Sequence, residues 1–132
     1  MIQRVQSLFL FFAVLLNTVI LFYAPIFINS EKNLTIMKDL QNRFPSLLLL
    51  ISTLLVLFAI FQFKNRLRQL MIVNLSRLSI AISFFLLIIF KEEGNQLYYG
   101  SFLLILPYII LLLSAYFIKK DEKLVKSADR IR

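Results

Sequence analysis

The sequence predicts an all-α integral membrane protein, a bundle of four transmembrane helices followed by a helical tail. Hydrophobic residues make up 60% of its 132 residues, against roughly 45–50% in a typical soluble domain. They gather in four runs, each long enough to cross a hydrocarbon core of ~30 Å, which takes about 20 apolar residues. Each run is apolar on every face, whereas a helix on the surface of a soluble protein keeps one polar face.

The first run extends from residue 7 to residue 28. A secretory signal peptide has an apolar segment of only about 7–15 residues and ends in small residues suited to cleavage. This run is longer, and its closing segment from Phe22 to Phe27 offers no such site. We therefore expect it to be retained as the first transmembrane helix.

A polar segment, residues 29–45, follows the first run. Within it Leu34, Met37 and Leu40 recur at a three-residue spacing, and Ser30 is placed to act as an N-cap. This spacing predicts a short helix that lies on the membrane surface.

The second run covers residues 46–63 and follows Pro45, a residue that the first turn of a helix tolerates because its missing N–H has no helical partner there. A short basic turn, residues 64–69, leads into the third run, residues 70–90. The third run has an uneven character, since its first half carries Asn74, Ser76 and Arg77 while residues 78–90 are almost purely apolar.

The fourth run covers residues 98–118, after a loop with a Gly94-Asn95 turn signal. The remaining residues, 119–132, form a basic tail whose apolar residues recur at helical spacing. Glu122 and Lys126 make a supporting i, i+4 ion pair if that tail is helical. We therefore predict an amphipathic helical tail that continues the fourth span.

The distribution of lysine and arginine predicts the orientation. Ten of the fifteen basic residues lie at the two termini and in the 64–69 turn, four lie in the other two loops, and Arg77 lies within a span. Because short loops rich in these residues stay in the cytoplasm, we expect both termini to be cytoplasmic. The net charge of +8 then suggests contact with anionic lipid at that face, and no nucleic acid partner is expected.

Polar side chains and prolines inside a membrane span cost free energy, because they leave polar groups in hydrocarbon. Those in the predicted spans are therefore candidate functional or packing positions: Asn17, Asn74, Arg77 and Pro107. Arg77 is either an anion contact that lines a cavity or a side chain that extends back to the cytoplasmic head groups. Asn17 is expected to hydrogen-bond between helices, with a substrate contact as the other interpretation.

Pro107 frees the backbone carbonyl of Leu103 and is expected to bend the fourth helix. We expect Asn17 or a serine to bond to that carbonyl. Small and hydroxyl residues at helix-contact spacing are predicted packing positions: Ser52, Thr53, Ser79, Ser83, Gly100 and Ser101.

The sequence lacks several residue types that catalysis and metal or cofactor binding usually require. It has no cysteine and no histidine, which removes thiolate nucleophiles, disulfides and the commonest metal and haem ligands. All seven acidic residues lie outside the spans, and a chain with two glycines holds no glycine-rich phosphate loop. We therefore expect no enzymatic activity, no metal and no cofactor.

The two ends of the chain carry a resemblance. The opening Met1-Ile2-Gln3-Arg4-Val5-Gln6, the closing stretch KKDEKLVKSADRIR from Lys119 to Arg132, and Asn65-Arg66 in the inner turn resemble an uncharacterised family of small four-helix bacterial inner-membrane proteins, a domain of unknown function. The resemblance implies a multi-pass protein of the bacterial inner membrane. That family has no assigned activity, so it lends no functional residues. The polar matches fall on the predicted cytoplasmic face, which implies a docking surface there.

The leading hypothesis is a non-enzymatic accessory or structural subunit that docks to a larger inner-membrane assembly through its tail and the 64–69 turn. The candidate docking residues are Arg66, Lys119, Lys120, Asp121, Glu122, Asp129 and Arg130. The alternative is a small transporter or channel that works as a homo-oligomer, with Asn17, Arg77 and Pro107 lining its path.

Overall fold

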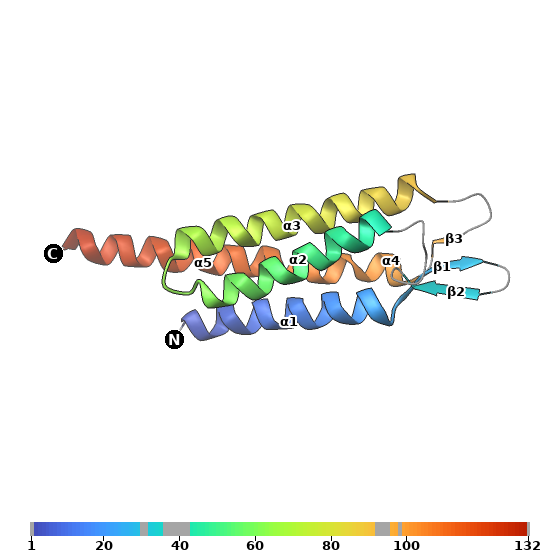
Figure 1. Cartoon of the computed structure of the whole chain (residues 1–132). Coiled ribbons are helices and arrows are strands. Elements are labelled where there is room, and N and C mark those ends of the chain that lie inside the picture. The colour runs from blue at the N-terminus through green and yellow to red at the C-terminus, as the bar shows by residue number, and fades with distance from the viewer. Residues whose placement is uncertain (1, 30–31, 36–42, 92–95, 98, 132) are drawn as a thin grey trace.

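In the computed structural model the helices run side by side as an antiparallel bundle (Figure 1). The structure describes residues 2–29, 32–35, 43–91, 96–97 and 99–131. The helices are α1 (Ile2–Phe22), α2 (Arg43–Phe61), α3 (Arg66–Ile89), α4 (Tyr99–Leu103) and α5 (Ile105–Ile131). Helices α4 and α5 follow one another as a single broken span, so the bundle consists of four helical spans.

Each long helix packs on two neighbours, in the cyclic order α1, α2, α3, α5. The most extensive contact joins α2 and α3. The centre of the bundle is filled by branched apolar side chains that have no exposure to solvent, among them one leucine from each long helix: Leu10, Leu49, Leu87 and Leu111.

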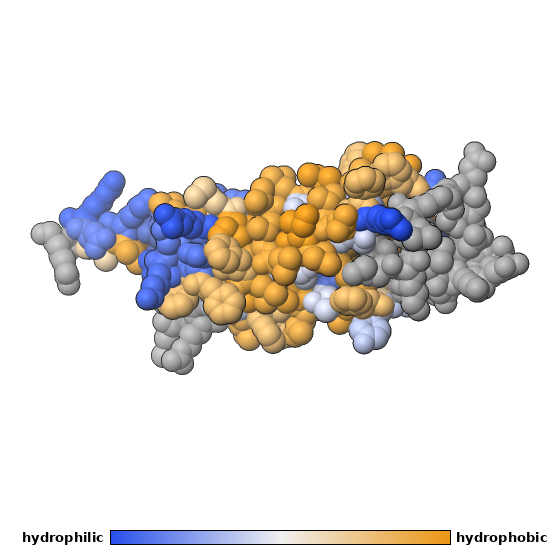
Figure 2. Space-filling model, viewed as in Figure 1, coloured by the Kyte–Doolittle hydropathy of each residue, from blue (hydrophilic) through white to orange (hydrophobic). Residues whose placement is uncertain are grey.

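The outer surface of the bundle is also apolar. Phe61 and Phe85 are 75% and 67% exposed, and many other large apolar side chains share this outward position. On the face shown in Figure 2, apolar residues form a belt across the middle, and hydrophilic residues gather over the end where α5 projects. A soluble monomer rarely exposes such a continuous apolar surface, whereas lipid solvates it. All four spans have the length and composition to cross a membrane, which confirms the predicted all-α membrane fold.

The first helix ends earlier than predicted. It stops at Phe22, and the chain from Pro25 to Asn29 is strand β1 rather than the last turn of a helix reaching residue 28. Pro25 disfavours helical geometry at Ala24 and has no N–H to continue the hydrogen-bond ladder. The hydrophobicity of the sequence does not reveal this change from helix to strand, because Ile26 and Phe27 are as apolar as the residues of the helix before them.

Strand β1 lies at the centre of a small antiparallel sheet in the order β2-β1-β3. Its neighbours are β2 (Lys32–Thr35) and β3 (Gln96–Leu97). The predicted surface helix is therefore wrong over residues 32–35, because pairing with β1 extends the backbone there. The rest of that prediction, including Ser30, Met37 and Leu40, lies outside the described residues.

The fourth span is broken at Leu104, between α4 and α5. The Leu104 N–H bonds to the Ser101 carbonyl at 3.4 Å, in a turn. The bend predicted from Pro107 thus takes the form of a break three residues earlier, since a proline ring clashes with the carbonyl four residues before it. Pro107 is buried in the first turn of α5, where its missing N–H has no helical partner.

Gly100 lies in the first turn of α4, close against the backbone of Ala24 and Pro25 at the start of β1. A β-carbon at this position would collide with the carbonyl of Pro25. The predicted packing role of Gly100 is therefore met by contact with β1 rather than with another helix.

Beyond the bundle, α5 continues without interruption to Ile131. Figure 1 shows it projecting past the start of α1 and past the turn between α2 and α3. The predicted helical tail is confirmed as part of this helix. We call this end of the bundle the terminal end and the opposite one the sheet end.

Candidate functional site

Hydrogen bonds between side chains and backbone fasten α2 to α3. The hydroxyl oxygens of Ser52 and Ser76 lie 2.7 Å apart, and each hydroxyl lies 3.2 Å from the backbone carbonyl of the other residue. Two further bonds join the same helices: Gln69 Nε2 to the Ala59 carbonyl, 3.0 Å, and Ser83 Oγ to the Pro45 carbonyl, 2.9 Å. Since lipid offers no substitute partner, these bonds hold the pair as one rigid hairpin.

The contact between α1 and α5 has fewer such bonds. Gln6 donates its side-chain amide to the Phe117 carbonyl at 3.1 Å, and the Phe9 ring stacks on the Phe117 ring with their centroids 5.6 Å apart. Asn17 is completely buried, yet neither its Oδ1 nor its Nδ2 meets a hydrogen-bond partner in the part of the chain that the structure describes. The bond that we expected from Asn17 to the Leu103 carbonyl is therefore not formed.

The register of these helices shows where Asn17 lies. Gln6 meets Phe117, and Asn17 follows Gln6 by eleven residues, so in an antiparallel pair it lies level with residues 106 and 107 of α5. Asn17 thus sits beside the first turn of α5 as predicted, but with its amide unpaired. The buried Ser114 hydroxyl on α5 also lacks a partner among the described residues.

Arg77 reaches from α3 to α5, where its guanidinium carbon lies 5.8 Å from the centre of the Tyr108 ring. It stands eleven residues after Arg66, roughly 16 Å along α3 and near the middle of the helix. Asn74, one turn before it, is half-buried. A cation over an aromatic ring gains about 0.5–2 kcal/mol, whereas an arginine at the centre of a membrane costs at least about 2.5–3.5 kcal/mol. Tyr108 alone therefore does not compensate this charge.

An apolar groove of ≈ 280 Å³ lies between α3 and α5 beside the Arg77–Tyr108 contact. Its walls come from α3 (Ile80, Ala81, Phe84, Phe85) and from α5 and the break before it (Leu104, Ile105, Tyr108). Tyr108 thus belongs both to the groove and to the contact with Arg77, which makes the two features neighbours.

At the terminal end, two of the predicted docking residues bind each other. Arg66 Nε lies 2.9 Å from Asp121 Oδ2; Asp121 is buried and Arg66 is half-buried. The contact is an ion pair without the alignment of a hydrogen bond. It ties the turn between α2 and α3 to α5, so these two residues hold the tail helix in place rather than offering free charges.

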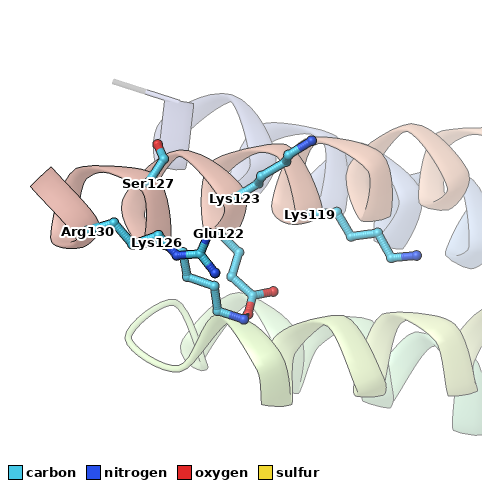
Figure 3. Close-up of a pocket in the computed structure, with 6 residues that line it drawn as sticks. All are labelled: Lys119, Glu122, Lys123, Lys126, Ser127 and Arg130. Atoms are coloured by element: carbon cyan, nitrogen blue, oxygen red, sulfur yellow. The ribbon is translucent and has the colours of Figure 1, made fainter.

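The remaining docking candidates lie around the projecting part of α5. Lys119, Lys120, Asp129 and Arg130 are exposed, and Glu122 pairs with Lys126 at 2.9 Å as the i, i+4 spacing predicted. A groove of ≈ 370 Å³ runs along this helix, with the side chains shown in Figure 3. It is lined by Lys119, Glu122, Lys123, Lys126, Ser127 and Arg130.

Sequence reasoning missed Gln6, Gln69, Ser76 and Tyr108, which carry the contacts between helices. Gln6 and Gln69 lie near the ends of their apolar runs, where a polar residue looks like part of a loop. Each stands directly before the start of a predicted run, so the rule that an amide within a membrane span must find a partner did not single out either residue.

The fold and the apolar belt define a small multi-pass membrane protein with four helical spans. The chain belongs to the family described as a domain of unknown function (DUF4293), whose family model matches residues 2–131. This confirms the predicted resemblance to an uncharacterised family. No curated protein and no solved structure matches the chain.

Proposed function

We propose that this protein is a non-enzymatic accessory subunit of a larger assembly in the bacterial inner membrane, to which it docks through the projecting part of α5. The observation that carries the proposal is a row of exposed cations on a helix that the Arg66–Asp121 ion pair ties to the bundle. The row consists of Lys119, Lys123, Lys126 and Arg130.

The spacing of these four residues places them along one side of the helix. They stand at i, i+4, i+7 and i+11, so they extend over roughly 16 Å. The one carboxylate in the groove, that of Glu122, is already paired with Lys126. The groove is therefore positively charged and is complementary to a protein surface whose carboxylates recur at helical spacing.

The Arg66–Asp121 ion pair supports this role because it fixes the direction in which α5 leaves the bundle. A partner that binds a helix already held in place loses less conformational entropy than one that must order a flexible tail. All six residues that line the groove come from α5 itself, so a partner's surface would form its second wall.

Both termini are proposed to be cytoplasmic, because lysine and arginine concentrate at the terminal end. Lys64 and Arg68 are exposed in and beside the turn at that end. In this orientation they lie at the level of the head groups, where contact with anionic lipid adds to the anchoring of the bundle.

The transporter or channel alternative has less support. Asn17 and Pro107, which would have to line a path, are buried in a centre filled by leucine and isoleucine side chains. Arg77 is half-buried beside a groove on the outside of the bundle.

The test is affinity purification from native membranes in mild detergent, with mass and stoichiometry determined. The double variant Lys123→Glu/Arg130→Glu should lose a stoichiometric larger partner while staying in the membrane fraction. The matched control is Arg43→Glu/Lys91→Glu, which makes the same change of charge at two exposed residues of the sheet end and should keep the partner. A lone homo-oligomer, or equal retention by both variants, would refute docking through α5.

A further inference from the structure

Arg77 has no counter-charge within the membrane. Its guanidinium contacts the Tyr108 ring, and it forms no ion pair with any residue that the structure describes. All seven acidic residues of the chain lie outside the four apolar runs. A second copy of this protein therefore cannot bring a carboxylate to the depth of Arg77 either.

A phospholipid is also poorly placed to neutralise Arg77. Lipid phosphates lie outside the ~30 Å hydrocarbon core, whereas Arg77 is roughly 16 Å along α3 from Arg66, which belongs to the charged terminal end. Acyl chains at that depth carry no charge. A carboxylate on a transmembrane helix of another protein, by contrast, can stand at any depth when a cation there compensates it.

The groove between α3 and α5 offers such a helix a place to pack. Ala81 follows Arg77 by one turn on the same side of α3, and it lines the groove together with the larger Phe84, Phe85 and Tyr108. Ala81, Phe85 and Ile105 are exposed on the outside of the bundle. The groove thus accepts apolar side chains from a neighbouring helix, as in other contacts between membrane helices.

We infer that Arg77, Tyr108 and this groove form the seat for a transmembrane helix of a different protein, which carries an aspartate or glutamate near the middle of the membrane. The carboxylate pairs with Arg77, and a large apolar side chain about one turn away fills the groove over Ala81. This inference rests on the proposed function and specifies how the partner is held within the bilayer.

The test is photo-crosslinking in intact cells, with a photoreactive amino acid placed at Ala81. The matched control position is Leu47, which is exposed on α2 and lies level with Ala81, since Ser52 lies level with Ser76 and Pro45 with Ser83. We expect position 81, and not position 47, to give an adduct with one membrane-spanning protein that has a carboxylate inside a span. Arg77→Gln should lower the adduct by at least about tenfold, whereas Arg77→Lys should keep most of it.

Two further variants decide the result even if Arg77→Gln impairs folding. Ala81→Leu fills the groove, leaves Arg77 in place and should block the adduct formed from a photoreactive residue at Phe85. An exchange of charges, Arg77→Asp together with arginine at the partner's carboxylate, should restore the adduct that each single change abolishes. Adducts with lipid or a second copy only, or an adduct that survives loss of the carboxylate, would overturn the inference.

The outcomes separate this inference from docking through α5. If a partner copurifies in a manner that depends on Lys123 and Arg130 but position 81 gives no adduct with it, the proposed function stands and the intramembrane seat is wrong. If the adduct forms and the Lys123→Glu/Arg130→Glu variant retains it, the seat stands and docking through α5 is wrong.

Discussion

Arg66 and Asp121 bring the turn between α2 and α3 into direct contact with α5, with Nε and Oδ2 2.9 Å apart at a largely buried position. The sequence marks both residues as charges outside the apolar runs, and we predicted that they contact a partner. In the structure they bind each other instead, and the pair connects the basic turn to the base of the projecting helix.

Removing one partner of this pair should destabilise the bundle. Arg66→Gln leaves the Asp121 carboxylate buried without its cation, so we expect the free energy of unfolding to fall by about 2 kcal/mol. Thermal unfolding in detergent measures the effect. Glu122→Gln, which breaks the ion pair with the exposed Lys126, is the control and should cost under about 0.5 kcal/mol. Equal melting temperatures for the two variants would contradict this account.

Asn17 and Gln6 are both buried amides of α1 that face α5, and they should respond in opposite directions to replacement by leucine. Asn17→Leu removes two unpaired polar atoms and should raise stability by about 1–2 kcal/mol. Gln6→Leu loses the bond to the Phe117 carbonyl and should lower stability by about 0.6–1 kcal/mol. A loss of stability in Asn17→Leu, measured by the same melting assay, would show that this amide has a partner after all.

The serine contact between α2 and α3 should be measurable as a coupling. Ser52→Ala leaves the buried Ser76 hydroxyl without its nearest partner, and the reverse holds for Ser76→Ala. Each single change should cost about 1 kcal/mol, and the double variant less than the sum of the two. Strict additivity in this double-mutant cycle would argue that the two hydroxyls do not interact.

Gly100→Ala should be poorly tolerated for a reason that lies in the backbone. The added methyl group would collide with the Pro25 carbonyl, and neither α4 nor β1 can move away without losing its own contacts. We expect a loss of about 1–3 kcal/mol. Ala81→Ser, a change of similar size at an exposed position of α3, should leave the melting temperature almost unchanged.

Deleting residues 127–132 should leave the bundle intact. Residues 127–130 are exposed on a single helix beyond the Arg66–Asp121 contact, so they contribute little to the core. The truncated protein should melt within about 0.5 kcal/mol of the full chain and, on the proposed function, should bind its partner more weakly. A large drop in melting temperature would mean that these residues pack on the bundle.

The number of spans and the helical tail could be predicted because they follow from the length and composition of each apolar run. The strands could not, because Ile26 and Phe27 are apolar enough to continue a helix, and their pairing with residues 96 and 97 depends on contacts distant in sequence. The Arg77 contact with Tyr108 was missed for a related reason. Hydropathy gives the depth of a residue, but only the rotation of α3 and α5 about their axes decides which side chains meet.

The small sheet has a consequence for how the chain reaches its final form. Strand β1 can pair with β2 as soon as the first loop has been made, but Leu97, which pairs with Phe27, follows it by 70 residues. The third strand therefore arrives only when three spans have been synthesised, and it joins the first loop to the last. Closing the sheet is then a late step of biogenesis that depends on correct placement of all the helices. A span inserted in the wrong direction would leave β1 with an open edge.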